Sequence, residues 1–214
     1  NGTIEIGQTI RIGYFSQENE YMDVSMKVID YVKEVGEYVT TSDGKITASQ
    51  MLERFLFDAA MQWSKIEKLS GGEKRRLYLM RVLMSAPNVL ILDEPTSYLD
   101  IRHKLELLTI LRKMAKENGI TVIMSLHEID LAQKISDQVI CVKGDRIAEF
   151  GDPEEIFTEA TIRDLYEIDN GYYDPIFGSV ELPKPEGEPE VLVLSSGKTG
   201  IPVYRKLQKA GIPF

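Results

Sequence analysis

Two adjacent carboxylates at the end of an apolar run are the side chains best placed to do chemistry. Asp93 and Glu94 directly follow Val89–Leu92, and such a short apolar run after Pro87-Asn88 is typical of a strand buried on both faces. Open α/β sheets place their ligands at the carboxyl ends of their strands. An aspartate after a strand is also common in simple turns, so this position alone does not assign a role.

A predicted helix start upstream of these carboxylates could bind an anion. Ser70 and Glu73 have the spacing of a capping box, which predicts a helix from there to about Ser85. Gly71 and Gly72 carry no Cβ in its first turn, where unpaired N–H groups and the positive end of the helix dipole favour an anion. A capping box is often only a cap. Here the capping box precedes the two carboxylates at this spacing, and PTSYLD follows them. This combination favours a functional role over a simple cap.

Together, LSGGE and LILDEPTSYLD resemble the signature, Walker B and D-loop motifs of ABC-type ATPases. The resemblance implies that Asp93 holds Mg²⁺ and that Glu94 is the base that polarises the attacking water. It implies that Asp100 lies in the loop that communicates with an opposite subunit. It also implies that Ser70–Gly72 binds the γ-phosphate of an ATP held by that second subunit.

Two more polar residues follow predicted strands. Gln17 ends the β-branched opening of the chain, and His127 follows the apolar run Ile120–Met124. Either residue alone is more often structural. Under the same resemblance, Gln17 matches the Q-loop glutamine that contacts Mg²⁺ and the attacking water, and His127 matches the H-loop histidine that contacts the γ-phosphate. His103, within a charged helical stretch, is expected to be an exposed surface residue.

The glycine-rich phosphate loop of the family does not occur in this sequence. No G-x-x-x-x-G-K-[ST] pattern is present, and the nearest match, around Lys198, would put its first glycine at Leu192 inside a predicted strand. Backbone N–H groups and the lysine of such a loop cradle the phosphates. The resemblance therefore implies an ABC domain without its amino-terminal portion, and we do not expect the chain by itself to bind ATP with ordinary ABC affinity.

The expected fold class is α/β. The resemblance implies a P-loop NTPase-like ABC ATPase core with an inserted helical subdomain and a carboxy-terminal βα extension. The expected segments are 1–18, the end of the core sheet with the Q-loop; 19–70, the helical subdomain; 71–182, the core with the signature helix, Walker B, D-loop and H-loop; and 183–214, an acidic Pro-rich linker and a βα unit.

Local signals predict further elements. Asp23 should cap a helix whose inner face includes Val28 and Val35, and Thr47 with Gln50 forms a second capping box. The other predicted elements are a helix over 101–118 ended by Gly119, a hairpin of strands 138–142 and 146–150, a short helix begun by Asp152-Pro153, a helix begun by Thr161, a strand over 190–194 and a helix over 201–210.

Composition limits the partners and the compartment. The 214 residues carry a net charge of −9, which argues against a broad nucleic-acid surface. The single cysteine, Cys141, lies in an apolar run and is expected to be buried in a reducing compartment. No signal peptide opens the chain and no apolar stretch is long enough to span a membrane. We therefore expect a cytoplasmic protein, which the resemblance places at the inner face of the membrane.

The resemblance changes along the chain and leaves the biological role open. Residues 1–96 are similar to the second ATPase domain of ABC-F proteins, which act on ribosomes, whereas residues 96–214 are similar to ATPases of siderophore, haem and cobalamin importers. The importer interpretation implies a head-to-tail dimer that hydrolyses ATP with Mg²⁺ and partners membrane permease subunits to import an iron chelate or cobalamin. An ABC-F ribosome factor and a truncated or chimeric chain without activity are the alternatives.

Overall fold

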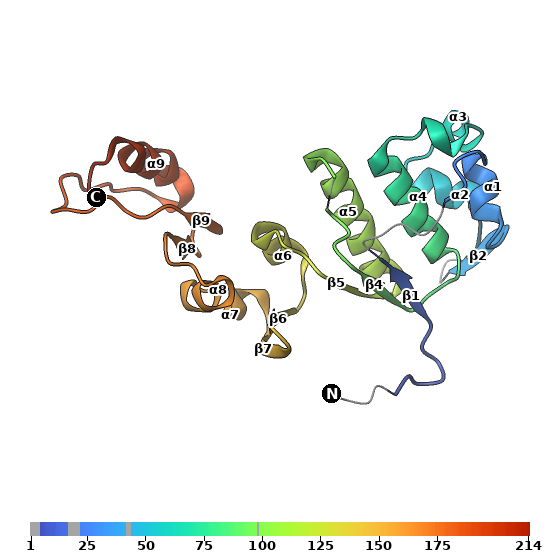
Figure 1. The fold of residues 1–214 in the computed structure, drawn as a ribbon, viewed down its shortest axis with the longest axis horizontal. Helices are drawn as coiled ribbons and strands as arrows, with labels where there is room; N and C mark the ends of the chain where they lie inside the picture. Colours follow the sequence, from blue (N-terminus) through green and yellow to red (C-terminus); the bar gives the residue numbers. More distant parts are fainter. Residues whose placement is uncertain (1–4, 17–21, 42–43, 98) are drawn as a thin grey trace. The chain divides into compact units, whose positions relative to one another are not determined.

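The computed structural model describes residues 5–16, 22–41, 44–97 and 99–214 (Figure 1). These residues divide into two compact units, the first ending at His127 and the second beginning at Glu128. Each unit has its own hydrophobic core and is described by itself.

The first unit is built on a three-stranded parallel sheet. Its strands are β1 (Ile12–Phe15), β4 (Val89–Leu92) and β5 (Thr121–Met124), in the order β1-β4-β5. The register pairs Phe15 with Leu92 and Leu92 with Met124, so the three strands end side by side. Leu90 and Leu92 are fully buried, whereas the alternate residues of β4 are half-buried. The predicted central strand is confirmed, although only one of its faces is fully covered in the described part of the chain.

Two long helices pack on this sheet. Helix α4 (Gly71–Leu83) lies against β1, and α5 (Ile101–Asn118) lies against β5 (Figure 1). A Cβ on Gly13 of β1 would stand 2.9 Å from Val82 Cγ1, so this glycine permits the close approach of α4. Helix α5 ends as predicted at Gly119, which adopts the left-handed conformation with φ 63°.

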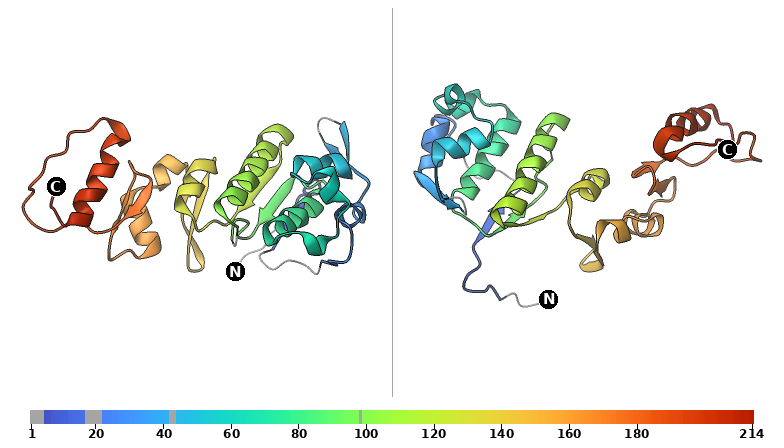
Figure 2. Two further views of the ribbon diagram at one scale, coloured as in Figure 1. Left: turned by 90° about the horizontal axis from the view of Figure 1, so that it is seen from above. Right: turned by 180° about the vertical axis from the view of Figure 1, so that it is seen from behind.

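A mainly helical group packs beside α4. It comprises α1 (Val28–Lys33), the hairpin of β2 (Tyr38–Thr41) and β3 (Gly44–Thr47), α2 (Ala48–Arg54), α3 (Ala59–Gln62) and a 3₁₀ turn at Ile66–Lys68. Helices α1 and α2 contact each other and α4, and Figure 2 shows this group from two further sides. The capping box of Thr47 and Gln50 is confirmed, with both reciprocal hydrogen bonds present.

Two predictions for this group are wrong, and one element was not predicted. Asp23 does not cap α1, because its carboxylate accepts hydrogen bonds from Ser25 and the helix begins after Lys27. Val35 is 40% exposed, since α1 ends at Lys33 and the helical face does not extend to it. The β2–β3 hairpin was not predicted.

The second unit is made of short elements around a small core. These are α6 (Ile129–Ile135), β6 (Val139–Lys143), β7 (Arg146–Gly151), α7 (Pro153–Ile156), α8 (Glu159–Tyr166), β8 (Tyr172–Asp174), β9 (Ser179–Glu181), a 3₁₀ turn at Gly197–Gly200 and α9 (Ile201–Ala210). Its core contains Phe157, Ile162 and Tyr173. The predicted β6–β7 hairpin, the buried Cys141 and the final helix are all present.

One helix boundary and one strand in the second unit differ from prediction. Helix α8 is capped by Thr158, whose Oγ1 accepts from the backbone N of Thr161, so the helix begins three residues earlier than expected. The apolar run over 190–194 is not a strand. Leu192 and Leu194 are 84% and 87% exposed, and no strand pairs with this run within the residues that the structure covers.

Candidate functional site

The predicted carboxylates lie where the parallel strands end. The backbone N of Asp93 donates to the carbonyl of Phe15 at the end of β1, at 2.9 Å. The backbone N of Ser125, just after β5, donates to the carbonyl of Leu92 at 3.0 Å. These two bonds continue the ladders past the last paired residues, so the polar residues after β4 and β5 are brought together at one edge.

Ser125 joins the two carboxylate-bearing residues. Its hydroxyl donates to Oδ1 of Asp93 at 3.0 Å and accepts from the backbone N of Glu94 at 2.8 Å. Ser125 was not among the predicted site residues. The signal that could have identified it is its place directly after β5, beside a strand that itself ends in carboxylates.

The side chain of Glu94 is held at both oxygens. Nε2 of His127 lies 2.6 Å from Oε1, and the hydroxyl of Ser97 donates to Oε2 at 2.8 Å. The hydrogen bond to His127, and after it the one from Ser97, hold the pKa of the Glu94 carboxyl below its ordinary value. Glu94 is therefore a carboxylate at neutral pH and can accept a proton, while the His127 side chain remains 73% exposed toward an incoming group.

The backbone of Glu94 is also constrained. Its φ is 44°, in the left-handed region that residues with a Cβ rarely adopt. Arg75 of α4 donates from Nη2 to the carbonyl of Glu94 at 2.7 Å and from Nε to the carbonyl of Pro95 at 3.3 Å. Arg75 was not among the predicted site residues, because an arginine within a helix carries no positional signal of its own.

The predicted anion-binding turn is a capped helix start. The hydroxyl of Ser70 accepts from the backbone N of Glu73 at 3.3 Å, and the Glu73 carboxylate accepts from the backbone N of Ser70 at 2.7 Å. Burial raises the pKa of Glu73, but the hydrogen bonds from Ser70 outweigh it, so the net pKa is lowered. A Cβ on Gly71 would meet nothing within 4 Å. The open approach to this helix start fits a phosphate-sized anion.

Asp100 and His103 form a pair, which corrects the expectation for His103. Oδ1 of Asp100 accepts from the backbone N of His103 at 3.0 Å, and Oδ2 lies 2.7 Å from His103 Nδ1. The backbone bond first, and the side-chain bond second, lower the pKa of Asp100. The His103 side chain is only 24% exposed, and a Cβ on Gly72 would lie 3.5 Å from its Cγ. His103 thus lies between the signature turn and Asp100 rather than on the open surface.

The structure therefore gathers the predicted residues into two groups. Asp93, Glu94 and His127 belong to the group at the strand ends, which Ser125 and Ser97 complete. The other group consists of Ser70, Gly71, Gly72 and Asp100, connected through His103. Gln17 lies outside the described residues, so its predicted place in the first group stays a prediction.

The group at the strand ends contains a carboxylate, which is a type of ligand that Mg²⁺ binds. Within the described ranges, no three His, Cys, Asp or Glu side chains form a metal cluster. Mg²⁺ is usually bound through one or two carboxylates together with substrate phosphates and water rather than by a complete protein cage. A single carboxylate at Asp93 fits this mode, and the helix start at Ser70 fits a phosphate.

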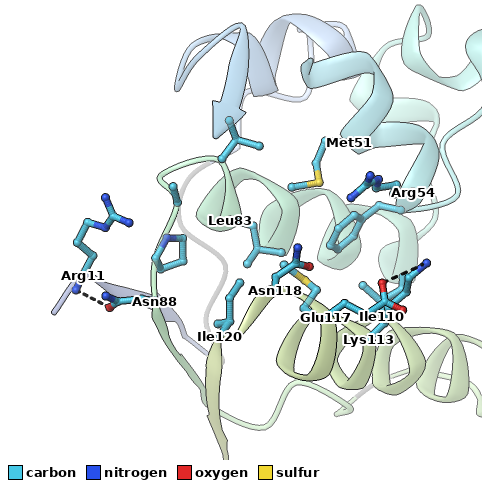
Figure 3. A pocket seen from close by; sticks show the side chains of 15 residues that line it. Arg11, Met51, Arg54, Leu83, Asn88, Ile110, Lys113, Glu117, Asn118 and Ile120 are labelled. Atoms are coloured by element: carbon cyan, nitrogen blue, oxygen red, sulfur yellow. Dashed lines mark hydrogen bonds and ion pairs between the residues drawn. The ribbon is translucent and has the colours of Figure 1, made fainter. Parts of the chain in front are cut away.

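A separate cavity opens at the other end of the sheet (Figure 3). Its volume is about 390 Å³, and Arg11, Asn88 and Ile120, which line it, directly precede β1, β4 and β5. Met51 of α2 and Leu83 of α4 lie on its walls. None of the predicted site residues lines this cavity, so it is distinct from the strand ends that carry Asp93 and Glu94.

Comparison with known proteins shows what this chain is similar to. Residues 6–97 match the ABC transporter family. The uncharacterized ABC transporter ATP-binding protein YfmR of Bacillus subtilis is 50% identical over 147 residues, which cover 68% of this chain and 23% of YfmR. The cobalamin import ATP-binding protein BtuD of Halobacterium salinarum is 34% identical over 153 residues, which cover 68% of this chain and 38% of BtuD. The chain thus spans less than half the length of both relatives.

The fold agrees with this result. A solved ABC transporter described as metal-chelate type, in an inward-facing conformation, superposes with a TM-score of 0.65 at 22% identity, covering 78% of this chain and 67% of that one. Among the described residues, no helix is both long and apolar enough to cross a membrane. Residues 6–97 carry an ABC transporter domain, and the chain is similar to ABC-type ATP-binding proteins.

Proposed function

We propose that the chain forms part of the ATP-binding and ATP-hydrolysing subunit of an ABC system. The observation that carries the proposal is the placement of Glu94. Its carboxylate follows the central strand and lies 2.6 Å from His127, and its backbone is fixed by Arg75. Such a carboxylate, ionised and oriented, can accept a proton from a water that attacks a phosphate.

The residues of the first group have distinct roles in this proposal. Asp93 and Gln17 would hold Mg²⁺, which would supply positive charge to offset that of the phosphates. Glu94 takes the proton of the attacking water on its carboxylate. His127, whose Nε2 shares a hydrogen bond with Glu94, orients that carboxylate and contacts the γ-phosphate. Ser125 keeps Asp93 and the backbone of Glu94 in register.

The second group serves an ATP held by another subunit. The N–H groups after Ser70 and the open space at Gly71 suit a phosphate that approaches from outside the chain. In the proposed head-to-tail dimer, Ser70–Gly72 of one subunit closes the site formed by Asp93 and Glu94 of its partner, and Asp100 lies at the contact. Catalysis then depends mainly on positioning and on the stabilisation of charge.

The proposed biological role is import of an iron chelate or cobalamin, with the subunit in the cytoplasm at the inner face of the membrane and bound to permease subunits. The similarity to a cobalamin importer ATPase and the fold shared with a metal-chelate type transporter support this role. The alternative, an ABC-F ribosome factor, rests only on the resemblance of residues 1–96. Co-purification of the full-length protein with membrane permease subunits would favour import, whereas co-sedimentation with ribosomes would favour the alternative.

The test of the enzymatic proposal is Glu94→Gln in the full-length protein. The substitution keeps the shape of the side chain and removes its charge. ATP binding should persist while phosphate release falls by about 10²-fold or more, the scale expected when a general base is lost. Glu117→Gln is the matched control, because Glu117 is an exposed glutamate near the end of α5 that pairs with Lys113 at 3.8 Å and does not belong to either group. Unchanged phosphate release by Glu94→Gln would refute the assignment, and a full-length protein without turnover would favour the inactive-chain alternative.

A further inference from the structure

Two consecutive arginines of α4 are buried but have different partners. Arg75 is 6% exposed and donates to the carbonyls of Glu94 and Pro95. Arg76 is 4% exposed and donates from Nη1 to Oε2 of Glu106 in α5 at 2.7 Å. Both guanidinium groups also lie over aromatic rings, at 5.0 Å for Arg75 and 5.6 Å for Arg76. Arg76 thus ties α4 to α5, whereas Arg75 ties α4 to the turn that carries the proposed base.

The geometry points to Arg75 as a positioning residue that couples the signature turn to Glu94 within one chain. Arg75 lies about one helical turn after Ser70 and Gly71, on the same helix. A rotation or shift of that helix start therefore moves the guanidinium, and with it the backbone carbonyl of Glu94. The inference rests on the proposed function, because it assigns a role to Arg75 in the turnover that Glu94 is proposed to catalyse.

The turn after β4 depends on such a contact. Glu94 has a φ of 44°, a conformation that persists only when the surrounding structure holds it. A guanidinium is a rigid planar fork, so its Nε and Nη2 can hold two successive carbonyls at once. Its stacking over Phe15, the last residue of β1, fixes the position of the fork itself. Arg75 therefore joins three segments, namely the signature helix, the end of β1 and the turn at Glu94.

The coupling has a direct consequence in the proposed dimer. In that dimer both chains contribute to each of the two ATP sites. Ser70–Gly72 of a given chain contacts the ATP of one site, while Glu94 of the same chain acts in the other site. A phosphate that binds at Ser70–Gly72 would be sensed through Arg75 as a change in the position of Glu94. Arg75 touches the backbone of the base rather than the reacting atoms, so its loss should alter turnover more than ATP affinity.

The experiment compares Arg75→Lys with Arg76→Lys in the full-length protein. Both substitutions keep the charge and remove the planar fork, and thermal unfolding identifies any variant that fails to fold. Arg75→Lys should lower kcat by about 10-fold with KM within about twofold, because a misplaced base costs rate rather than binding. Arg76→Lys should lower the melting temperature and leave kcat within about twofold. If Arg75→Lys does not fold, Arg75→Gln, a neutral side chain that still donates to a carbonyl, takes its place.

A double-mutant cycle with Ser70→Ala separates coupling from general damage. The double variant of Ser70→Ala and Arg75→Lys should lose less kcat than the product of the two single fold-losses, because both substitutions interrupt the same connection. The double variant of Ser70→Ala and Arg76→Lys should lose the full product of its two single fold-losses. An Arg75→Lys variant with the kcat of Arg76→Lys, or multiplication in both cycles, would overturn the inference. The proposed function would survive either result as long as Glu94→Gln abolishes turnover, so the two failures can be told apart.

Discussion

Nε2 of His127 lies 2.6 Å from Oε1 of Glu94, although 33 positions of sequence separate the two residues. The contact exists because β4 and β5 are parallel neighbours with matched ends, and each residue follows its strand by a short turn. An exposed imidazole and a less exposed carboxylate thus share one hydrogen bond at the strand ends. In this state His127 holds Glu94 in an ionised form.

This contact predicts a change in the titration of Glu94. The hydrogen bond to His127 is the largest influence that lowers the pKa of Glu94, so His127→Ala should raise that pKa toward the ordinary glutamate value. The interaction stabilises the fold above the unfolded pKa of Glu94 and is lost as the pH falls through the lower folded pKa. The variant should therefore lose less stability than the wild type on acidification through that range.

Carboxyl-carbon NMR titration of Glu94 is the direct measurement. His103→Ala is the control, because His103 contacts Asp100 and should leave the pKa of Glu94 unchanged. If Glu94 titrates identically in the wild type and in His127→Ala, the hydrogen bond does not exist in solution.

The N-cap of α4 predicts that removal of the Ser70 hydroxyl lowers the stability of the protein. Ser70→Ala removes the hydroxyl that accepts from the backbone N of Glu73, and should lower the free energy of unfolding by about 1 kcal/mol. Urea denaturation measures this loss. Ser85→Ala is the control, since the hydroxyl of Ser85 donates to the carbonyl of Val82 just past the other end of the helix. If both variants unfold at the wild-type urea concentration, Ser70 is not a significant cap.

The contact between Asp100 and His103 predicts that two substitutions of Asp100 differ in their effect on stability. Asp100→Asn retains an oxygen that can accept from the backbone N of His103 and should keep most of the cap, whereas Asp100→Ala should cost about 1 kcal/mol. Thermal unfolding of the two variants checks this expectation. Equal stability of the two variants would show that the cap contributes little.

Local sequence signals predicted the elements that carry the site. Four predicted features depend only on neighbouring residues, and the structure has all of them. They are the capping boxes at Ser70 and Thr47, the strand before Asp93 and the end of α5 at Gly119. The β2–β3 hairpin and the start of α8 were missed or misplaced. The start of α8 depended on which of two threonines would cap the helix, and the structure uses Thr158 rather than Thr161.

Long-range contacts explain what the sequence could not provide. The role of Arg75 depends on α4 packing over β1, which brings a helical arginine to carbonyls 19 and 20 positions away. His103 appeared to be a surface residue because only the folded turn brings its ring to Asp100 and Gly72. The run over 190–194 has the composition of a strand, but strand formation also needs a neighbour with which to pair.

The two glycines Gly71 and Gly119 predict opposite outcomes, and together they test the phosphate site. A Cβ at either position would meet no atom within 4 Å, so packing does not distinguish them. Gly71 is the first residue of α4, where alanine is tolerated and can favour the helix by up to about 1 kcal/mol. Gly119 has a φ of 63°, so Gly119→Ala should destabilise the fold by about 1 kcal/mol.

For ATP-driven dimerisation the expected order is the opposite, with Gly71→Ala the damaging substitution and Gly119→Ala the neutral one. If the space at Gly71 exists for a phosphate of a second subunit, the added methyl of Gly71→Ala should weaken ATP-driven dimerisation of the full-length protein by about 10-fold or more, because it obstructs the approach to the N–H groups of the helix start. Gly119→Ala should leave that dimerisation intact, since it lies at the far end of α5. Light scattering with and without ATP measures dimerisation, and thermal unfolding measures stability. Dimerisation that persists in a stable Gly71→Ala variant would show that this turn does not receive the phosphate.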